Sequence, residues 1–518
     1  MPETVDCDVL IVGTGPVGAI YARYLADAGL RVLMVDAGAA TSLPAGGHLR
    51  NDYLHQRDLR SYHDAIAARL YPLSLPAASR PLKLGGAAMP PRASRGNNLN
   101  PEQVAARNLP AAAACYAVGG MGTVWTCLAP RFHPALERWD LIPDRQWDVL
   151  YALAEDALGV RSDLFDDSVR QRVLLEILAQ DHPSTHPAPS PVAASRRAGG
   201  GDLIRWTGPR EILGNRLQGG GLEILPQHVV QRLEHRGGKV LWAQVQGLGP
   251  WRERRIRAET FVVAAGAVAT PQLLWHSRIA RDEPSALGRY LCDHPLAFAQ
   301  AALLPRVLDE IRRLTGSRES VPIPPADPDP FLALPLSEGR PFHSLILSGP
   351  YDRRLLEESL DERLLLNFYW YSRVQPRRDN RVTFNDELRD LHGLPKPTFH
   401  YSLEAGDREV VDRTLQDLRQ IGGSIGTFLP MAPPQLLAAG SSMHTLGTTR
   451  MGRADDGDSV VDAGGRVWGF SNLYLGGTGV VPSATASNPT LTACAVAIRS
   501  ALEILGREVP QPAPPVSR

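Results

Sequence analysis

The first 36 residues alternate a short apolar run, a helical pattern and a second apolar run. Asp8 to Val12 (DVLIV) is rich in β-branched residues and stops at Gly13, as a buried parallel strand does. After Pro16 the apolar residues recur at helical spacing up to Gly29, at Val17, Ile20, Tyr21, Tyr24, Leu25 and Ala28. Arg31 to Val35 is a second apolar run that ends at Asp36. The pattern predicts a strand–helix–strand unit.

Later segments repeat these patterns less regularly. Weak periodicity between about 40 and 110 predicts long loops with short helices, and helical spacing returns over Trp147 to Ala179. The proline-rich stretch His182 to Val192 is compatible with a linker or with an edge strand. Further strands are expected at Leu222–Leu225, Val229–Leu233, Val240–Val245, Thr260–Ala265, Leu364–Tyr371, Pro397–Leu403 and Asn472–Leu475, and further helices at Thr270–Trp275 and Pro489–Leu505.

Composition limits the classes of protein to consider. With about 150 residues per domain, 518 residues allow one very large domain or two to three ordinary ones. Lys+Arg and Asp+Glu both number 55, so no net charge favours nucleic acid or an anionic membrane as a partner. Hydrophobic residues at 43% and charged residues at 21% are typical of folded globular domains.

Cysteine usage and the apolar runs bear on location. The five cysteines form no CxxC pair, which fits a reducing compartment better than a disulfide framework. The apolar runs are far shorter than the roughly 18 residues that span a bilayer, and the acidic start does not resemble a signal peptide. We therefore expect a cytoplasmic protein without a membrane segment.

A glycine-rich turn between the first strand and the first helix carries the first chemical signal. Gly13, Gly15 and Gly18 match GxGxxG, in which the glycines permit a tight turn, close approach of a pyrophosphate and close helix–strand packing. The helix N-terminus would supply amide donors to the phosphates. Asp36 ends the second strand, where an acid holds ribose hydroxyls and disfavours a 2′-phosphate. The motif predicts FAD or NAD rather than NADP, and the alternative is a merely structural glycine turn.

Three segments of the C-terminal third bear on the choice between FAD and NAD, and two further segments belong to the same set of motifs. They are Gly119–Pro130 (GGMGTVWTCLAP), Ile421–Gly423, Ser442–Gly452 (SMHTLGTTRMG), Arg466–Gly479 (RVWGFSNLYLGGTG) and Pro482–Ala493 (PSATASNPTLTA). With these motifs the chain resembles the glucose-methanol-choline (GMC) flavin oxidoreductases over nearly its whole length. Within them it is most similar to the pyranose 2-oxidases and the bacterial C-glycoside 3-oxidases.

The resemblance implies an α/β fold with FAD as the cofactor. A Rossmann-like FAD-binding domain would comprise residues 1–45, 195–295 and 440–518, and a substrate-binding domain with an antiparallel sheet would comprise 296–439. Residues 46–194 would be mixed, with a flavin-contacting segment at 115–130. The expected cofactor-binding residues are Gly13, Gly15, Gly18, Asp36, Gly119, Gly120, Met121, Thr123, Trp125, Thr126, Val229, Gly266, Gly477, Pro489 and Thr490.

Two residues match the family's catalytic pair. His444 stands at the position of the catalytic histidine and Asn488 at that of its partner. Alcohol oxidation removes the hydroxyl proton while hydride leaves the carbon for flavin N5, and imidazole suits that proton near neutral pH. Asn488 also precedes Pro489 as a helix N-cap would, so a cap role is an alternative compatible with catalysis. That helix N-terminus would stabilise negative charge on a reduced flavin.

One departure from the family's pattern concerns the link to the flavin. Fungal relatives carry a flavin-linked histidine where this chain has Val124, and valine cannot form that bond. We therefore predict noncovalent FAD, with Thr126 retaining the family's side-chain hydrogen bond near the flavin.

The substrate is less well defined by the sequence. Phe368 to Tyr371 are four consecutive aromatic residues, and on a strand one alternate pair would line a pocket or the core. The segment Phe342–Tyr351 takes the place of the family's substrate loop but lacks the sequence typical of the fungal enzymes. This departure makes a glycoside, including one with an aromatic aglycone, oxidised at carbon 3 as plausible as a sugar oxidised at carbon 2.

Other sites are disfavoured. Cys292-Asp293-His294 contains metal-ligand types without the spacing that gathers them on one ion, and we expect no metal site.

The predicted function is FAD-dependent oxidation of a secondary hydroxyl, with dioxygen or a quinone-like acceptor reoxidising the flavin. A GMC enzyme for a non-sugar alcohol and a non-catalytic flavin-binding accessory protein are the alternatives, and the oligomeric state stays open.

Overall fold

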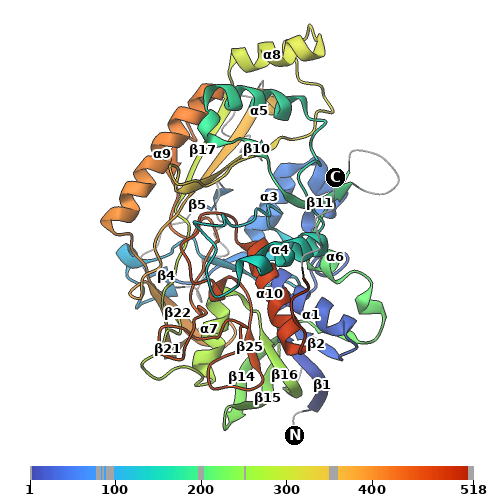
Figure 1. Cartoon of the computed structure of the whole chain (residues 1–518), viewed down its shortest axis with the longest axis vertical. Coiled ribbons are helices and arrows are strands. Elements are labelled where there is room, and N and C mark those ends of the chain that lie inside the picture. Colours follow the sequence, from blue (N-terminus) through green and yellow to red (C-terminus); the bar gives the residue numbers. More distant parts are fainter. Residues whose placement is uncertain are drawn as a thin grey trace.

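Two seven-stranded sheets occupy opposite ends of the long axis of the molecule (Figure 1). The computed structural model describes residues 3–77, 83–84, 87–88, 99–196, 203–249, 253–348 and 360–511. The first sheet is mainly parallel, and several of its strands are followed directly by helices, whereas the second is antiparallel with helices on one face. The predicted α/β class is confirmed.

The first sheet is mainly parallel and contains the first and the last strand of the described chain. Its strands follow the order β13 (Leu222–Leu225), β2 (Val32–Val35), β1 (Glu3–Val12), β16 (Arg254–Val263), β15 (Lys239–Gly247) and β14 (His228–Arg236), with β25 (Leu473–Leu475) also paired to β16. Leu10 of β1 lies opposite Leu33 on one side and Phe261 on the other. A strand enclosed by neighbours and covered on both faces needs apolar residues throughout, which explains the run at its end.

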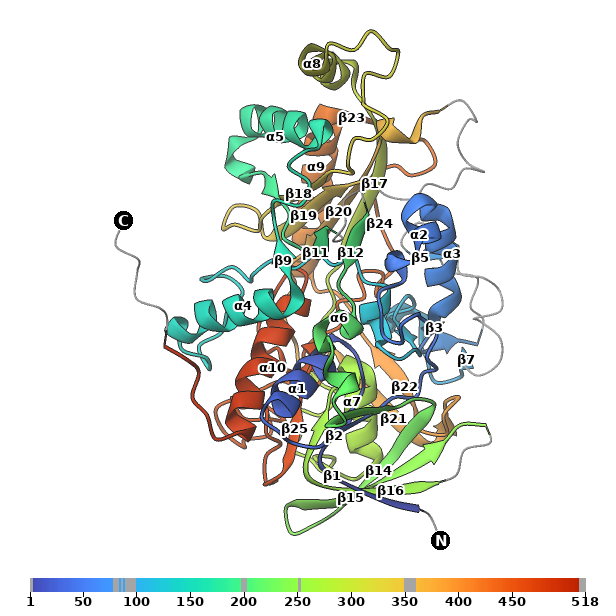
Figure 2. The ribbon, with the colours of Figure 1, turned by 90° about the vertical axis from the view of Figure 1, so that its right-hand side faces the viewer.

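Helices from distant parts of the chain pack on this sheet and on one another. They are α1 (Pro16–Asp27), α6 (Pro209–Leu213), α7 (Gly266–His276), α4 (Asp144–Leu158) and α10 (Thr490–Ile504). Helix α1, near the start of the chain, packs beside α10, near its end, and α4 lies against the other side of α10 (Figure 2). The strand–helix–strand prediction is confirmed by β1, α1 and β2.

The predicted helix cap at Asn488 is wrong. Helix α10 begins at Thr490 with Pro489 as its N-cap residue, and no side chain caps the first turn. The physical reason is that the Asn488 side chain is directed at a histidine on another loop, described below, instead of at the helix amides.

The second sheet is antiparallel. Its strands follow the order β10 (Ala188–Pro189), β18 (Phe331–Leu334), β19 (Phe342–Leu347), β20 (Leu365–Ser372), β17 (Leu296–Leu303) and β23 (Gly426–Phe428), with β24 (Gln435–Leu436) also on β17. Helices α5 (Val169–Asp181), α8 (Pro305–Thr315) and α9 (Ala405–Ile425) share a hydrophobic cluster with one face of it. The proline-rich stretch therefore contributes an edge strand, the place in a sheet where a residue without an N–H is tolerated.

Smaller elements connect the two sheets. The hairpin β21 (Arg381–Arg389) and β22 (Pro395–His400) lies near α7. The remaining elements are α2 (Tyr53–Arg57), α3 (Leu59–Arg69), β3 (Leu70–Pro72), β4 (Leu75–Pro76), β5 (Lys83–Leu84), β6 (Ala87–Ala88), β7 (Leu99–Asn100), β8 (Ala113–Cys115), β9 (Val160–Arg161), β11 (Val192–Arg196), β12 (Ile204–Trp206) and short 3₁₀ turns. Among the described residues, none of the helices combines the length and the hydrophobicity that crossing a membrane requires.

Candidate active site

A cavity of about 370 Å³ opens at the carboxyl ends of the parallel strands. It is lined by the last residues of β1 and β2, by the start of α7, and by Gly477 just after β25. From there it continues to His444 and to the start of α10 at Pro489 and Thr490. Ligands of open α/β sheets bind at this edge, because the strand ends and helix N-termini converge there.

The glycine turn is shaped to admit a ligand. Gly13 has φ of +101°, and a Cβ there would lie 2.5 Å from the carbonyl oxygen of Ala264. A Cβ on Gly18 would collide with the Gly13 carbonyl, so helix α1 can approach β1 only without a side chain. At Gly15 no atom lies within 4 Å of the place that a Cβ would take, and this residue lines the cavity. The open space beside the α1 N-terminus fits a phosphate group.

Thr14, which was not predicted as a site residue from the sequence, links Asp36 to the glycine turn by hydrogen bonds. One oxygen of its carboxylate accepts hydrogen bonds from the Thr14 amide at 3.0 Å and the Thr14 hydroxyl at 2.5 Å, and the other accepts from the Gly38 amide at 2.7 Å. The Thr14 hydroxyl in turn accepts a hydrogen bond from the Gly119 amide at 2.7 Å. Burial raises the pKa of Asp36. Thr14 occupies a variable position of GxGxxG, so the motif itself gave no signal for it.

The structure brings most of the predicted cofactor-binding residues to this cavity. The residues that line it are Gly13, Gly15, Asp36, Gly120, Met121, Trp125, Val229, Gly266, Gly477, Pro489 and Thr490. Four others stand outside its lining. Gly18 and Gly119 pack behind the turn, buried Thr123 donates its hydroxyl hydrogen bond to the Gly120 carbonyl, and Thr126 is exposed.

Val124 faces away from the cavity. Its side chain is buried in a hydrophobic cluster with Leu49, Tyr62 and Cys115, against which Met121 and Met443 pack. Its neighbour Trp125 lines the cavity and donates its indole N–H to the Thr207 carbonyl at 2.8 Å. The segment thus alternates between a structural side chain and one that faces the cavity.

His444 and Asn488 meet although 44 residues separate them. Asn488 Nδ2 lies 3.3 Å from His444 Nε2, and His444 lines the cavity beside the start of α10. Burial, with a smaller contribution from nearby His343, lowers the pKa of His444 to about 3. The ring is therefore neutral across the ordinary pH range, and it is a weaker base than the near-neutral imidazole expected from the sequence.

Two buried carboxylates hold the loops that carry this pair. Asp293 accepts hydrogen bonds from the Gly440 amide at 2.9 Å and the Ser442 hydroxyl at 2.7 Å, and the Ser442 hydroxyl accepts one from the His444 amide at 3.2 Å. Burial raises the pKa of Asp293 to about 6. The carboxylate of Asp293 thereby fixes the backbone of the loop that carries His444.

Glu137 holds the loop that carries Asn488 in the same way. Its carboxylate accepts hydrogen bonds from the amides of Ala486 and Ser487 at 2.8 and 2.9 Å and from the Ser487 hydroxyl at 2.9 Å. The Glu137 carbonyl also accepts a hydrogen bond from the Ser483 hydroxyl at 2.7 Å. The residues immediately before Asn488 are therefore held by a side chain fully buried in the protein.

The four aromatic residues of β20 divide between its two faces. Phe368 and Trp370 are buried in the cluster with α9, where the Trp370 indole donates to Asp417 at 2.7 Å. Tyr369 and Tyr371 take the opposite face, and the Tyr371 ring centroid lies 5.0 Å from that of His444. One pair thus supports the sheet and the other faces the candidate site.

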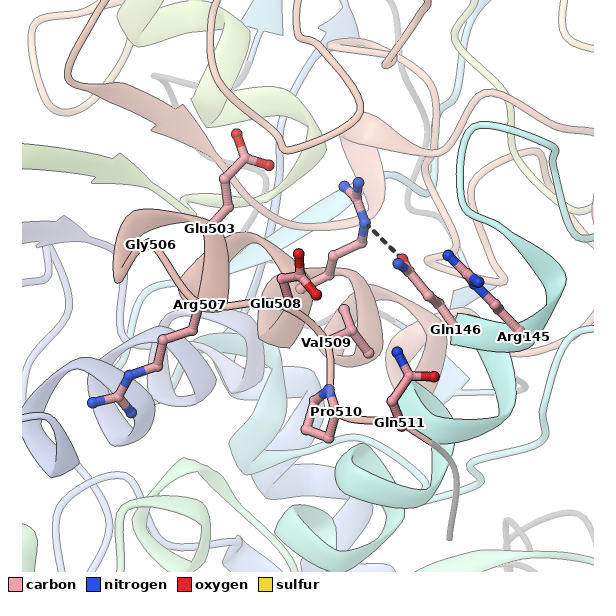
Figure 3. A pocket seen from close by; sticks show the side chains of 10 residues that line it. Arg145, Gln146, Glu503, Gly506, Arg507, Glu508, Val509, Pro510 and Gln511 are labelled. Atoms are coloured by element: carbon pink, nitrogen blue, oxygen red, sulfur yellow. Dashed lines mark hydrogen bonds between the residues drawn. The ribbon is translucent and has the colours of Figure 1, made fainter. Parts of the chain in front are cut away.

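A second hollow lies at the carboxyl end of α10 (Figure 3). It mixes arginine and glutamate side chains, and Arg499 donates to the Gln146 amide oxygen at 3.4 Å across it. None of the residues predicted for the cofactor or for catalysis lines this hollow.

Similarity to known protein families bears on what this site does. Two family models described as GMC oxidoreductase match residues 178–296 and 376–497, and a model described as FAD binding domain matches residues 6–80. Pyranose 2-oxidase of Emericella nidulans is 35% identical over 96% of this chain and 92% of that protein. The chain belongs to the GMC oxidoreductase family.

Two further similarities describe the place of this GMC oxidoreductase among its relatives. C-glycoside 3-oxidase of Arthrobacter globiformis is 31% identical over 96% of this chain and 94% of that protein. The crystal structure of pyridoxine 4-oxidase from Mesorbium loti superposes with a TM-score of 0.65, covering 97% of this chain and all of the other, at 19% identity. The structural similarity shows a shared fold.

FAD is the cofactor of this GMC oxidoreductase, as the FAD-binding segment and the family show. The residues present fit it, because the cavity extends from Asp36 past the open space at Gly15 to His444 and the α10 N-terminus. The protein is accordingly an FAD-dependent oxidoreductase acting on CH–OH groups.

Proposed function

We propose that this enzyme oxidises a secondary hydroxyl of a sugar or glycoside to a ketone, at carbon 2 or carbon 3. The observation that carries the proposal is the contact between His444 and Asn488 at the end of the cavity where α10 begins. The names of the relatives, pyranose 2-oxidase and C-glycoside 3-oxidase, support the substrate class.

His444 and Asn488 would act on the hydroxyl group together. FAD, when bound, supplies the acceptor of the hydride at flavin N5 and passes the electron pair to dioxygen or a quinone-like acceptor. His444 Nε2 takes the hydroxyl proton, so that the O–H bond breaks as the new N–H bond forms. Asn488 Nδ2, 3.3 Å from this nitrogen, is placed to donate a hydrogen bond to the same substrate oxygen. The low pKa of His444 keeps Nε2 unprotonated before the reaction.

The flavin is held without a covalent bond in this proposal. Val124 offers no nucleophile or electrophile, and its side chain is buried among hydrophobic residues. Gly13, Gly15 and the first amides of α1 would hold the pyrophosphate, with Asp36 accepting from the ribose hydroxyls. Thr126 is exposed and does not line the cavity, so the hydrogen bond from its side chain near the flavin rests on the family resemblance alone.

The face of the antiparallel sheet that lies opposite α5, α8 and α9 is our candidate for sugar recognition. Next to Tyr371, this face carries Tyr369, Phe298 and the hydrogen-bonded pair Gln300–Asn367, whose amide groups lie 2.8 Å apart. Aromatic rings suit the C–H faces of a sugar or an aromatic aglycone, and amides suit its hydroxyls. Of the segment Phe342–Tyr351, residues 342–347 form β19, and 349–351 lie outside the described residues.

The arrangement of the sheets supports a two-domain organisation. We propose an FAD-binding domain of residues 1–45, 195–295 and 440–518, and a substrate-binding domain of 296–439 to which α5 and β10 are added. The addition rests on the packing of α5 in the cluster beneath the antiparallel sheet and on the pairing of β10 with β18.

We also propose a cytoplasmic location, since all five cysteines are free and buried.

The experiment that tests the proposal is anaerobic mixing of the yellow holoenzyme with free sugars and with O- and C-glycosides. Bleaching of the flavin by a sugar or glycoside and recovery of its keto product would support the proposal. Absence of bleaching by every sugar and glycoside, at full FAD occupancy, would refute it.

A further inference from the structure

A second histidine lies directly behind His444. His294 Nδ1 is 3.1 Å from His444 Nδ1, and the two rings meet edge to face with centroids 5.1 Å apart. On its other side, His294 Nε2 is 2.9 Å from the Thr485 hydroxyl oxygen. His294 is 0% exposed, so both of its ring nitrogens are engaged inside the protein.

The hydrogen bonds around the two rings determine where their protons sit. Asn488 Nδ2 can only donate, so the His444 Nε2 that it faces must offer a lone pair. A neutral imidazole carries one proton, which His444 then holds on Nδ1, directed at His294. His294 Nδ1 must therefore accept, and its own proton lies on Nε2 and is donated to Thr485. Burial lowers the pKa of both rings, which keeps them neutral.

We propose that His294 is a positioning residue that acts with Asn488 to fix the tautomer of His444, so that Nε2 is the nitrogen free to accept the substrate proton. Without the His294 acceptor, the Nδ1–H of His444 would be buried without a partner, and the Asn488 amide could turn its unpartnered Oδ1 to accept from an Nε2–H instead. With the other tautomer, Nε2 would carry a hydrogen and could not act as a base. Once Nε2 has gained a proton, the Nδ1–H of the His444 cation donates to neutral His294, and a charge-assisted hydrogen bond is stronger than a neutral one. This catalytic consequence rests on the proposed function, whereas the tautomer itself does not.

The residue before His294 reinforces the assignment. Asp293 holds the backbone of the 440–444 loop through Gly440 and Ser442, while His294 holds the His444 ring. The loop is otherwise under backbone strain, because Met443 has φ of +57°, which a residue with a side chain rarely adopts. Two consecutive residues thus orient both the main chain and the side chain of the base.

Other titratable groups also face the pair. His343 on β19 influences both rings, Tyr371 on β20 packs against His444, and the Tyr401 hydroxyl donates to the Asp293 carbonyl at 3.3 Å. A pH profile alone would therefore combine several groups, and the test needs a signal from the His444 ring itself.

The first test measures the tautomer directly. In ¹⁵N-histidine-labelled holoenzyme, the ring signals of His444 are assigned by their loss in His444→Asn. We expect a protonated Nδ1 and an unprotonated Nε2 in the wild type, and a shift towards the Nε2–H tautomer in His294→Leu. A wild-type ring protonated on Nε2, or a His294→Leu spectrum unchanged from wild type, would overturn the proposal. His235→Leu, which removes a partly buried histidine that bonds to the Ser277 carbonyl far from His444, serves as the matched control.

The second test measures flavin reduction in single turnover. In His294→Leu the rate constant of reduction should fall about 10-fold or more with little change in the dissociation constant of the sugar. His294→Asn should recover part of the rate, because its carbonyl oxygen can accept at the position of Nδ1. Equal losses in both variants would overturn the proposal. If no sugar reduces the wild type, the proposed function fails, and the NMR result still decides the tautomer.

Discussion

The carboxylate of Glu137 accepts a hydrogen bond from the backbone amide of Ser487, 350 positions further along the chain. This contact places a buried carboxyl group immediately behind the loop that carries Asn488. The equivalent contact on the His444 side is made by Asp293. The geometry of the proposed catalytic pair therefore depends on two carboxylates that take no part in the proposed chemistry.

Replacement of Glu137 by Gln should destabilise the protein. The amide group would place N–H donors where the carboxylate accepts from the Ser487 hydroxyl and, at 2.8 Å, from the His133 amide. A buried donor left without an acceptor costs about 1–3 kcal/mol, so the free energy of urea unfolding should fall by that amount. Glu155→Gln, which removes a partly exposed ion pair with Arg131, should cost about 1 kcal/mol or less. Equal losses in the two variants would contradict a special role for Glu137.

The two faces of β20 should respond differently to substitution. Trp370→Phe removes the indole donor to Asp417 and should lower stability by about 1–3 kcal/mol while leaving KM for the sugar unchanged. Tyr371→Leu removes a ring that packs on His444 and should raise KM by about 2- to 10-fold. Steady-state kinetics and urea unfolding on both variants check this, and a raised KM in Trp370→Phe would argue against the assignment of faces.

Stability should fall as the pH drops below about 6.5. Burial lowers the pKa of His343 to about 3, so below about pH 6.5 the unfolded chain binds a proton that the folded chain does not. The contribution of neutral, buried His343 to the free energy of unfolding is complete above pH 6.5 and is lost as the pH falls towards 3. The free energy of unfolding of His343→Leu should therefore fall by about 1.4 kcal/mol less per pH unit than that of the wild type in this range.

Urea unfolding at two pH values measures this slope. Leu345→Met on the same strand is the control, because it changes packing without changing a titratable group. The control should shift the unfolding free energy equally at both pH values. A His343→Leu slope identical to that of the wild type would show that folding does not lower the pKa of this histidine.

The flavin should leave the protein on denaturation. The family resemblance assigns Val124 to the position of the flavin-linked histidine of fungal relatives, and its side chain is buried among hydrophobic residues, so under the proposal acid precipitation should transfer the yellow colour to the supernatant. Absorbance of the supernatant and flavin fluorescence of the denatured chain on a gel measure the two fractions. Flavin remaining on the polypeptide would refute noncovalent binding.

The parts of the fold predicted from the sequence are those encoded locally. The apolar run of β1, the glycine turn and the periodicity of α1 lie within 27 residues, and each signal has its own geometric cause. The helical spacing over Trp147–Ala179 is also local, but it resolves into the two helices α4 and α5. Helix capping at Asn488 was wrong because the preferred partner of its side chain lies on another loop.

The supporting residues of the site could not be predicted in the same way. The Asp293-His294 dipeptide stands out in the sequence only as a source of metal ligands, because its partners Ser442 and His444 lie about 150 residues away. Glu137 has no motif at all, and its role exists only through contacts with residues near 487. Sequence patterns identify a residue's chemistry, whereas its partner depends on packing of distant segments.

Anaerobic flavin reduction with product identification tests the central claim most directly. The holoenzyme should bleach on mixing with a sugar or with an O- or C-glycoside, and the product should be a ketone at carbon 2 or carbon 3. His444→Ala should retain yellow FAD yet reduce the rate of bleaching by ~100-fold or more. Unchanged bleaching in His444→Ala, or a wild-type flavin at full occupancy that no sugar or glycoside reduces, would contradict the account.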